Sequence, residues 1–98
     1  MDGSQEKPAP PKRYEVRLER GVLKWLAALQ DRALRLRFEK AIDALADTPR
    51  PAGCTKLAGT TRRYRIRIGH YRVIYEIRDK VLLVLVLDAG HRRDIYRN

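Results

Sequence analysis

The feature that most restricts the fold of this chain is an alternation of basic and apolar residues on both sides of Gly69-His70, in the stretch RRYRIRIGHYRVIYEI. A period of two predicts β-strands over residues 63–68 and 71–77, because successive strand side chains point to opposite faces. Glycine at the first of two turn residues favours a type II′ turn. The sequence therefore predicts an antiparallel hairpin with a defined register.

That register sorts the side chains of the hairpin into two kinds of surface. It pairs Ile68 with Tyr71 and Arg63 with Glu76, and paired residues point to the same side of a sheet. One side is then apolar and suited to a core, whereas the other collects arginines. Opposed like charges destabilise a sheet by up to about 1 kcal/mol per pair, so a bound anion would explain them; arginines splayed into water are the alternative. The residues of this second side are Arg63, Arg65, Arg67, Arg72, Ile74 and Glu76.

Elsewhere in the chain the apolar spacing changes between strand and helix patterns. Tyr14–Leu18 alternates like a short strand, and residues 22–29 and 32–46 show the spacing of two helices, with Asp31 as the N-cap of the second. Residues 81–87 are apolar on both faces, which predicts an internal strand covered on both sides. The predicted fold is α+β, in the order β-α-α-β-β-β, with an antiparallel sheet and two helices packed on one face.

The first residues of the chain differ from the rest. Residues 1–12 contain three prolines and few large apolar side chains, so we expect a flexible leader there and a single domain over residues 13–98.

Charge indicates the kind of partner. The 98 residues include 22 Lys and Arg against 12 Asp and Glu, for a net charge of +10, and most of the cations are arginine. Arginine favours planar contacts to phosphate or carboxylate, although codon usage in a GC-rich genome would also enrich it. We expect a polyanionic partner, either nucleic acid or an acidic protein.

Other residue types exclude some classes of protein. The single cysteine, Cys54, forms no disulfide within the chain, and with two histidines it offers no zinc-ligand spacing. The sequence also lacks a signal peptide and an apolar run of about 20 residues. We therefore expect a cytoplasmic protein without metal, cofactor or membrane partner.

The C-terminal segment adds a second cluster of basic residues. It contains His91, Arg92, Arg93, Tyr96 and Arg97 directly after Gly90, which permits a sharp turn back toward the hairpin. Guanidinium groups bind phosphates and a tyrosine ring stacks on a base. A tyrosine that closes the core is an equally good interpretation of Tyr96 alone.

Three segments stand in a characteristic order and spacing: Lys56-Leu57-x-Gly59, residues 64–75, and Gly90-His91-Arg92-x-x-x-Tyr96. Together they resemble the RelE toxins of bacterial toxin–antitoxin pairs, over about residues 14–97. The resemblance implies a small α+β domain that enters the ribosomal A site, contacts 16S rRNA and cuts the mRNA there without a metal ion. It also implies attack of the 2′-hydroxyl on the adjacent phosphate, giving a 2′,3′-cyclic phosphate, and an acidic antitoxin as partner, with a toxin that is monomeric or held in that complex.

Site residues follow from the matched positions. Arg65 and Arg67 match the two basic residues of the family's second strand, Arg72 and Arg92 match the residues that hold the phosphate, and Tyr96 matches the tyrosine that orients the base. Further RNA contacts are expected from Arg63, Arg93, Arg97 and Lys56.

One departure from the family concerns the proton. The two second-strand residues are lysines in the best-known members, and arginine is a poor general base because it hardly ever loses its proton. Either catalysis relies mainly on electrostatic stabilisation and strain, or His91 or Tyr96 transfers the proton.

Three other functions remain open at this stage. The first is a ParE-like toxin directed at DNA gyrase, and the second is a non-catalytic RNA-binding or ribosome-binding module. The third is an inactive toxin retained for antitoxin binding.

Overall fold

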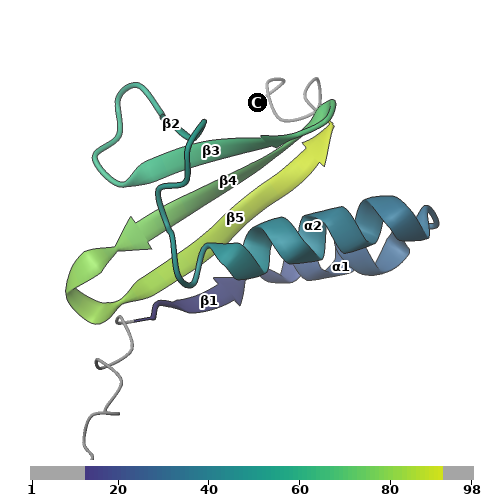
Figure 1. Cartoon of the computed structure of the whole chain (residues 1–98), viewed down its shortest axis with the longest axis horizontal. Helices are drawn as coiled ribbons and strands as arrows, with labels where there is room; N and C mark the ends of the chain where they lie inside the picture. The colour runs from purple at the N-terminus through teal and green to yellow at the C-terminus, as the bar shows by residue number, and fades with distance from the viewer. Residues whose placement is uncertain (1–12, 92–98) are drawn as a thin grey trace, which may run out of the picture.

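The computed structural model describes residues 13–91 and consists of two helices packed against a five-stranded sheet (Figure 1). The two helices run side by side along one side of the sheet, so the α+β prediction is confirmed. The elements are β1 (Glu15–Leu18), α1 (Arg20–Ala28), α2 (Arg32–Ala44), β2 (Thr55–Lys56), β3 (Arg63–Ile68), β4 (Tyr71–Arg78), the 3₁₀ turn η2 (Asp79–Val81) and β5 (Leu83–His91).

The β3–β4 hairpin has the register that the sequence predicts. All six pairs are present, from Arg63 with Glu76 to Ile68 with Tyr71. Gly69 has a φ of 62°, and His70 is absent from the positive-φ residues, as a type II′ turn requires. Local alternation and turn chemistry therefore place all four arginines of the hairpin on one face.

The sheet as a whole is mixed, in the order β1-β5-β4-β3-β2. β1 pairs with β5 in parallel, and the other three pairings are antiparallel. The prediction of a wholly antiparallel sheet is wrong at β1, because a parallel pairing joins distant strands and leaves no signal in local spacing. The short strand β2 is a fifth strand that the predicted order lacks.

Both helices form close to their predicted bounds. The carboxylate Oδ1 of Asp31 accepts a hydrogen bond from the backbone N–H of Leu34 at 3.0 Å, which confirms the N-cap of α2. α1 begins at Arg20, two residues earlier than the apolar spacing indicates, and α2 ends at Ala44, two residues earlier than predicted.

Strand β5 differs most from its prediction. The turn η2 takes up Asp79–Val81, and Leu82 follows with a left-handed φ of 51°. The strand then runs through Gly90 to His91, with Leu87 as an extra residue because Tyr75 pairs with Val86 and Ile74 with Asp88. The helices cover β5 on one face only, since Val84 and Val86 are fully buried and the alternate leucines are half-buried.

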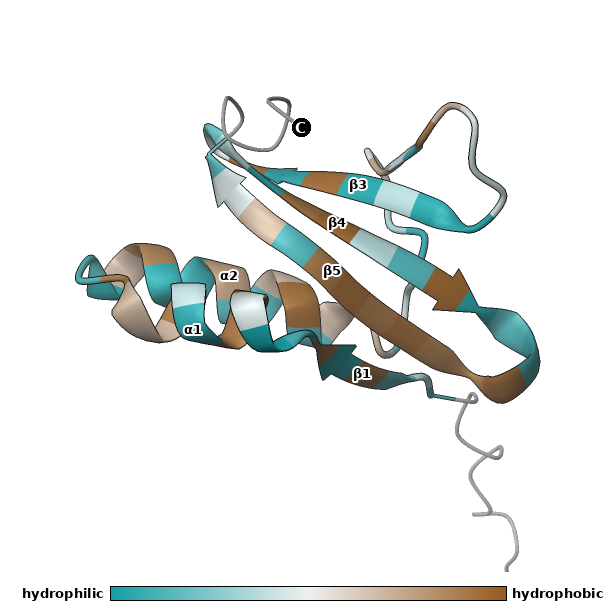
Figure 2. Cartoon of the chain, turned by 180° about the vertical axis from the view of Figure 1, so that it is seen from behind, coloured by the Kyte–Doolittle hydropathy of each residue, from teal (hydrophilic) through white to brown (hydrophobic). Residues whose placement is uncertain are grey.

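The core lies between the helices and the near face of the sheet. Trp25, Phe38 and Tyr71 form an aromatic cluster with ring centroids 5.0 to 5.9 Å apart. Figure 2 shows apolar residues along most of β5 and polar residues more often on β3. The core strands and α2 thus hold the hairpin in a fixed position. Of the helices in residues 13–91, neither has the length and apolar character needed to cross a membrane.

Candidate nucleic-acid interface

The side of β3 and β4 that faces away from the helices carries the predicted arginines, and we call it the arginine face. Its paired residues are Arg63 with Glu76, Arg65 with Ile74, and Arg67 with Arg72. Residue pairing also adds Arg78 on β4, and Asp88 and Gly90 on β5.

Near the β4–β5 turn, Glu76 offsets part of the positive charge of the arginine face. Arg78 Nε donates a hydrogen bond to Glu76 Oε2 at 2.6 Å, and Arg63 Nε lies 3.6 Å from Oε1. The hydrogen bond from Arg78, helped by the charge of Arg63, lowers the pKa of Glu76, so the carboxylate stays ionised at neutral pH. Sequence reasoning missed Arg78 because the predicted strand ended at residue 77, one residue before the end of β4.

Near the β3–β4 turn, the charge is predominantly positive. Arg65 is half-buried, Arg67 is exposed, and Arg72 is 3% exposed. Arg72 lies opposite Gly90, and a Cβ built on Gly90 would meet no atom within 4 Å. The glycine therefore places no side chain of β5 against Arg72.

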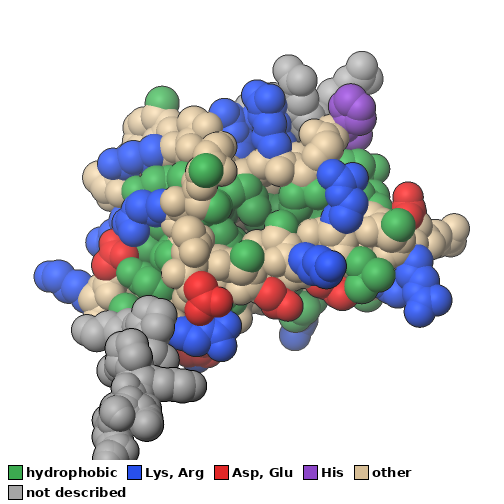
Figure 3. Space-filling model, in the orientation of Figure 1, with side chains coloured by type: hydrophobic (Ala, Val, Ile, Leu, Met, Phe, Trp, Pro, Cys, Tyr) green, Lys and Arg blue, Asp and Glu red, His purple; other side chains and the backbone are tan. Residues whose placement is uncertain are grey.

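The basic surface continues from this turn onto α2. A groove of about 410 Å³ lies between Arg37 and Lys40 of α2 and Arg67 of β3, and Arg37 Nη1 and Nη2 would both lie 3.6 Å from a Cβ on Gly69. Within residues 13–91, these three cations have no carboxylate at ion-pair distance. Figure 3 shows Lys and Arg side chains both beside β3 and over α2. The sequence reasoning missed Arg37 and Lys40 because it used α2 only for its apolar stripe.

A carboxylate also lies on the arginine face, at Asp88. It is half-buried and paired with Ile74, which is two residues from Arg72 along β4 and so the next residue on the same face. Its Oδ1 accepts a hydrogen bond from the backbone N–H of Ala89 at 2.9 Å, which leaves Oδ2 available for another proton donor. The sequence reasoning treated Asp88 as the end of a strand, and only the extra residue Leu87 directs its side chain to this face.

The remaining predicted residues lie elsewhere. His91 pairs with Tyr71, and its ring makes an edge contact with Tyr71 at 5.4 Å, on the helix side of the sheet. Lys56 is exposed and pairs with Tyr64, also on the helix side. Neither residue lies on the arginine face. Arg92, Arg93, Tyr96 and Arg97 lie outside the described residues.

A second polar cluster closes the end of the sheet at the β4–β5 turn. Arg50 donates to both carboxylate oxygens of Asp79, at 2.9 and 3.3 Å, and the Tyr14 hydroxyl donates to Oδ1 at 2.6 Å. Arg50 Nε also donates to the Tyr64 hydroxyl at 3.1 Å. The hydrogen bonds from Arg50 and then Tyr14 lower the pKa of Asp79. We call Tyr14, Arg50, Tyr64 and Asp79 the turn cluster, and its bonds are internal to the fold.

Tyr75 supports the turn cluster from the core. Its ring stacks beside Tyr64, with centroids 6.0 Å apart, and its hydroxyl donates to the backbone carbonyl of Pro49 at 2.7 Å. Burial raises the pKa of Tyr75, so this hydroxyl stays protonated as a donor. The loop after α2 is thereby fixed to β4.

Comparison with known proteins identifies the family. The sequence profile described as the ParE toxin of type II toxin–antitoxin systems, parDE, matches residues 12–96. The chain is 36% identical over 87 residues to the toxin RelG of Mycobacterium tuberculosis, covering 86% of this chain and 97% of that protein. A putative RelE-like toxin protein of Escherichia coli is 30% identical over 88 residues, with 86% and 90% covered.

Solved structures agree with this assignment. RelE in the archaeal RelE–RelB complex from Pyrococcus horikoshii superposes with a TM-score of 0.73 at 34% identity, covering 82% of this chain and 96% of that one. The toxin–antitoxin complex RelBE2 from Mycobacterium tuberculosis gives 0.66 at 28% identity, with 82% and 99% covered. The chain belongs to the RelE/ParE family and is a RelE-type toxin of a type II toxin–antitoxin system.

Proposed function

We propose that this toxin is a ribosome-dependent mRNA endoribonuclease that cuts mRNA in the A site and so inhibits translation. The observation that carries the proposal is the concentration of Arg65, Arg67 and Arg72 at one end of the arginine face, where Gly90 lies opposite Arg72. Cations fixed around a phosphate stabilise the charge that it gains in the transition state.

The proposed chemistry needs no metal. The 2′-hydroxyl loses its proton to a base, and its oxygen attacks the adjacent phosphorus. The bond to the 5′ oxygen breaks, and that oxygen takes up a proton from an acid, so a 2′,3′-cyclic phosphate and a 5′-hydroxyl result. Arg72 and Arg92 hold the phosphate, Arg65 and Arg67 stabilise its added charge, and Tyr96 orients the base. Lys56, Arg63, Arg93 and Arg97 contribute further RNA contacts.

The proton of the 2′-hydroxyl needs a separate acceptor, since arginine retains its own proton. His91 and Tyr96 are the candidates from sequence. Asp88 is a third, because its carboxylate lies on the same face as Arg72. A general base must come within hydrogen-bond reach of the proton that it removes. Asp88 shares a face of the sheet with Arg72, whereas His91 lies on the other face.

The test is induced expression of the wild type and of Arg72→Ala/Arg92→Ala, followed by mapping of RNA 5′ ends. We expect new ends within translated codons for the wild type and a loss of about 10²-fold or more for the variant. Intact mRNA with full growth in the wild type would refute the ribonuclease proposal.

A gyrase inhibitor is the second candidate, favoured by the match to the ParE profile. In the same cells, collapse of DNA supercoiling with intact mRNA would support it. Association with ribosomes without new RNA ends would support a binding module instead.

The proposed partner in the resting cell is an acidic antitoxin, in line with the toxin–antitoxin complexes among the structural relatives. Because the target is the ribosome, the site of action is the cytoplasm. The net charge of +10 suits both the antitoxin and ribosomal RNA.

A further inference from the structure

A basic groove lies between α2 and the β3–β4 turn, next to the arginine face. Its volume is about 410 Å³, and we call it the α2–β3 groove. Its three cations are exposed, and one of them, Arg67, belongs to the arginine face as well. Because one side chain serves both surfaces, the groove is the next basic surface for a strand bound on that face. The lining residues are Arg37, Lys40, Ala41, Arg67, Ile68 and Gly69.

Helix stability does not account for the two cations that α2 contributes. Arg37 and Lys40 are three residues apart, so they are neighbours on the helix surface, where like charges repel. The other positions three or four residues from Arg37 hold Ala33, Leu34 and Ala41, and none is acidic. Within residues 13–91, neither cation has a carboxylate at ion-pair distance. An anion bound between them would turn this repulsion into attraction.

The side chain of Arg37 extends from α2 to the hairpin. Its Nη1 and Nη2 atoms would both lie 3.6 Å from a Cβ on Gly69. Gly69 has a φ of 62°, which the turn requires and which side chains disfavour, so no side chain separates the guanidinium from the turn. The groove therefore has guanidinium groups from two elements, Arg37 of α2 and Arg67 of β3. Guanidinium groups suit the planar, bidentate contacts that phosphate oxygens make.

The α2–β3 groove offers charge without an apolar anchor. Of the large apolar side chains in residues 13–91, those that are exposed are Leu23, Leu36 and Val81, and none of them lines the groove. Ile68, which does line it, is only 6% exposed. A protein partner takes most of its binding energy from a few well-packed anchor side chains, whereas an RNA backbone is bound mainly by cations. The composition of the groove therefore favours nucleic acid over protein.

We propose that the α2–β3 groove is a second phosphate subsite for single-stranded RNA, beyond the phosphate held at Arg72. Arg37 and Lys40 bind the second phosphate from α2, and Arg67 lies between the two subsites. The inference rests on the proposed function, which takes RNA as the polyanion. Contacts to phosphate position a strand and carry no base information. The second subsite therefore strengthens the binding of longer RNA whatever its sequence.

The test uses the purified full-length toxin and labelled RNA, measured by fluorescence anisotropy at several salt concentrations. The RNA carries 2′-O-methyl groups, so the attacking hydroxyl is blocked and binding is measured without cleavage. We expect Arg37→Gln/Lys40→Gln to weaken the binding of an RNA of about eight nucleotides by about tenfold. The slope of log Kd against log salt should fall by about 0.7, the value for one phosphate contact. Binding of a trinucleotide, which is too short to occupy both subsites, should remain unchanged.

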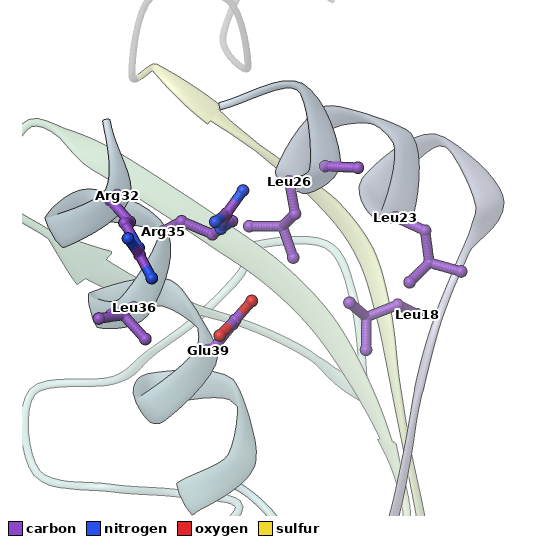
Figure 4. Close-up of a pocket in the computed structure, with 8 residues that line it drawn as sticks. Leu18, Leu23, Leu26, Arg32, Arg35, Leu36 and Glu39 are labelled. Atoms are coloured by element: carbon purple, nitrogen blue, oxygen red, sulfur yellow. The ribbon is translucent and has the colours of Figure 1, made fainter. Parts of the chain in front are cut away.

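The same helix supplies a matched control. Arg32 and Arg35 lie on another side of α2, where they border a groove between α1 and α2 (Figure 4). Among the described residues, neither has a carboxylate at ion-pair distance. Arg32→Gln/Arg35→Gln therefore removes the same charge from the same helix. We expect it to leave RNA affinity within about twofold at 0.15 M salt, because charges more than about 8 Å from the RNA are screened. Thermal melting of both double variants checks that each is folded.

Equal losses in the two double variants would overturn the inference, since total charge alone would then govern binding. An equal loss for the trinucleotide and the longer RNA would also overturn it, because both would then occupy a single subsite. A loss confined to duplex RNA, or to a polyglutamate peptide, would assign the groove to folded RNA or to an acidic protein instead.

The binding data also separate this inference from the ribonuclease proposal. RNA binding that follows the variants as expected, in a toxin that cuts no mRNA, would support the second subsite while the ribonuclease proposal fails. Unaltered binding by Arg37→Gln/Lys40→Gln, in a toxin that cuts mRNA, would refute the second subsite and leave the ribonuclease proposal standing.

Discussion

At the β4–β5 turn, arginine side chains lie against carboxylates, whereas at the β3–β4 turn the basic side chains gather with few acids among them. Arg50 is held by Asp79, and Arg78 and Arg63 by Glu76. At the other end Arg67, Arg37 and Lys40 have no such partner within the described part of the chain. The same residue type therefore serves the fold at one end of the sheet and remains available to an external anion at the other.

The largest expected effect comes from removing two arginines at the β3–β4 end. Arg65→Ala/Arg67→Ala should lower the rate of mRNA cleavage on programmed ribosomes by about 10²-fold or more, because two phosphate-stabilising charges are lost. The matched control is Arg17→Ala/Arg78→Ala, which removes two arginines paired with Glu15 and Glu76 from the same side of the sheet. Equal losses in both double variants would mean that only total charge matters.

A smaller effect tests the β4–β5 end as a structural element. Tyr75→Phe removes the hydrogen bond to the carbonyl of Pro49 and leaves that carbonyl short of a donor. We expect a loss of about 1–3 kcal/mol in the free energy of unfolding, measured by urea denaturation, with RNA cleavage per folded molecule unchanged. A stability equal to that of the wild type would show that water replaces the tyrosine hydroxyl.

The salt dependence of RNA binding distinguishes an arginine that contacts phosphate from an arginine that is already paired with a carboxylate. Arg67→Ala should reduce the slope of log Kd against log salt for single-stranded RNA by about 0.7, the value for one phosphate contact. Arg78→Ala should leave the slope unchanged, because its guanidinium is already held by Glu76. The opposite result would place the RNA over Arg78 and away from the β3–β4 turn.

The smallest expected effect depends on pH. Asp79 has a lowered pKa in the folded state, so its contribution to stability is present above its unfolded pKa, about 3.9, and is lost as the pH falls through the folded value. Because the pair with Arg50 is about half exposed, Asp79→Asn should cost no more than about 1 kcal/mol at neutral pH. Thermal melting of both proteins should show a lower melting temperature for the variant above about pH 5. The two melting temperatures should converge as the pH falls below about 4. A difference that persists at pH 2 would assign it to packing.

The parts of the fold that follow from local chemistry could be predicted, and those that depend on distant pairing could not. The register of β3 with β4 and the cap at Asp31 follow from alternation, Gly69 and a single carboxylate. The parallel pairing of β1 with β5 joins residues nearly seventy positions apart, and the two residues of β2 are too few for a periodic signal.

The candidate site divides in the same way. Arg65, Arg67 and Arg72 could be assigned to one face from the hairpin alone. The partners of Glu76, the approach of α2 to Gly69, and the position of Asp88 required the packed structure, because each joins elements that the sequence treats separately. The burial of Arg72 also contradicts the view of the arginine face as uniformly solvated.

The extra residue Leu87 has a consequence for variation in this chain. Upstream of it, odd-numbered residues of β5 point away from the helices, whereas downstream the even-numbered ones do. Leu87 therefore shifts the alternation of inward and outward side chains along β5 by one residue. Deletion of this one residue would make the pairing of β5 regular and leave Asp88 and Gly90 on the side of Arg72. If Leu87 instead entered the ladder as an ordinary strand residue, Asp88 and Gly90 would turn inward, and Ala89 and His91 would take their places on that side.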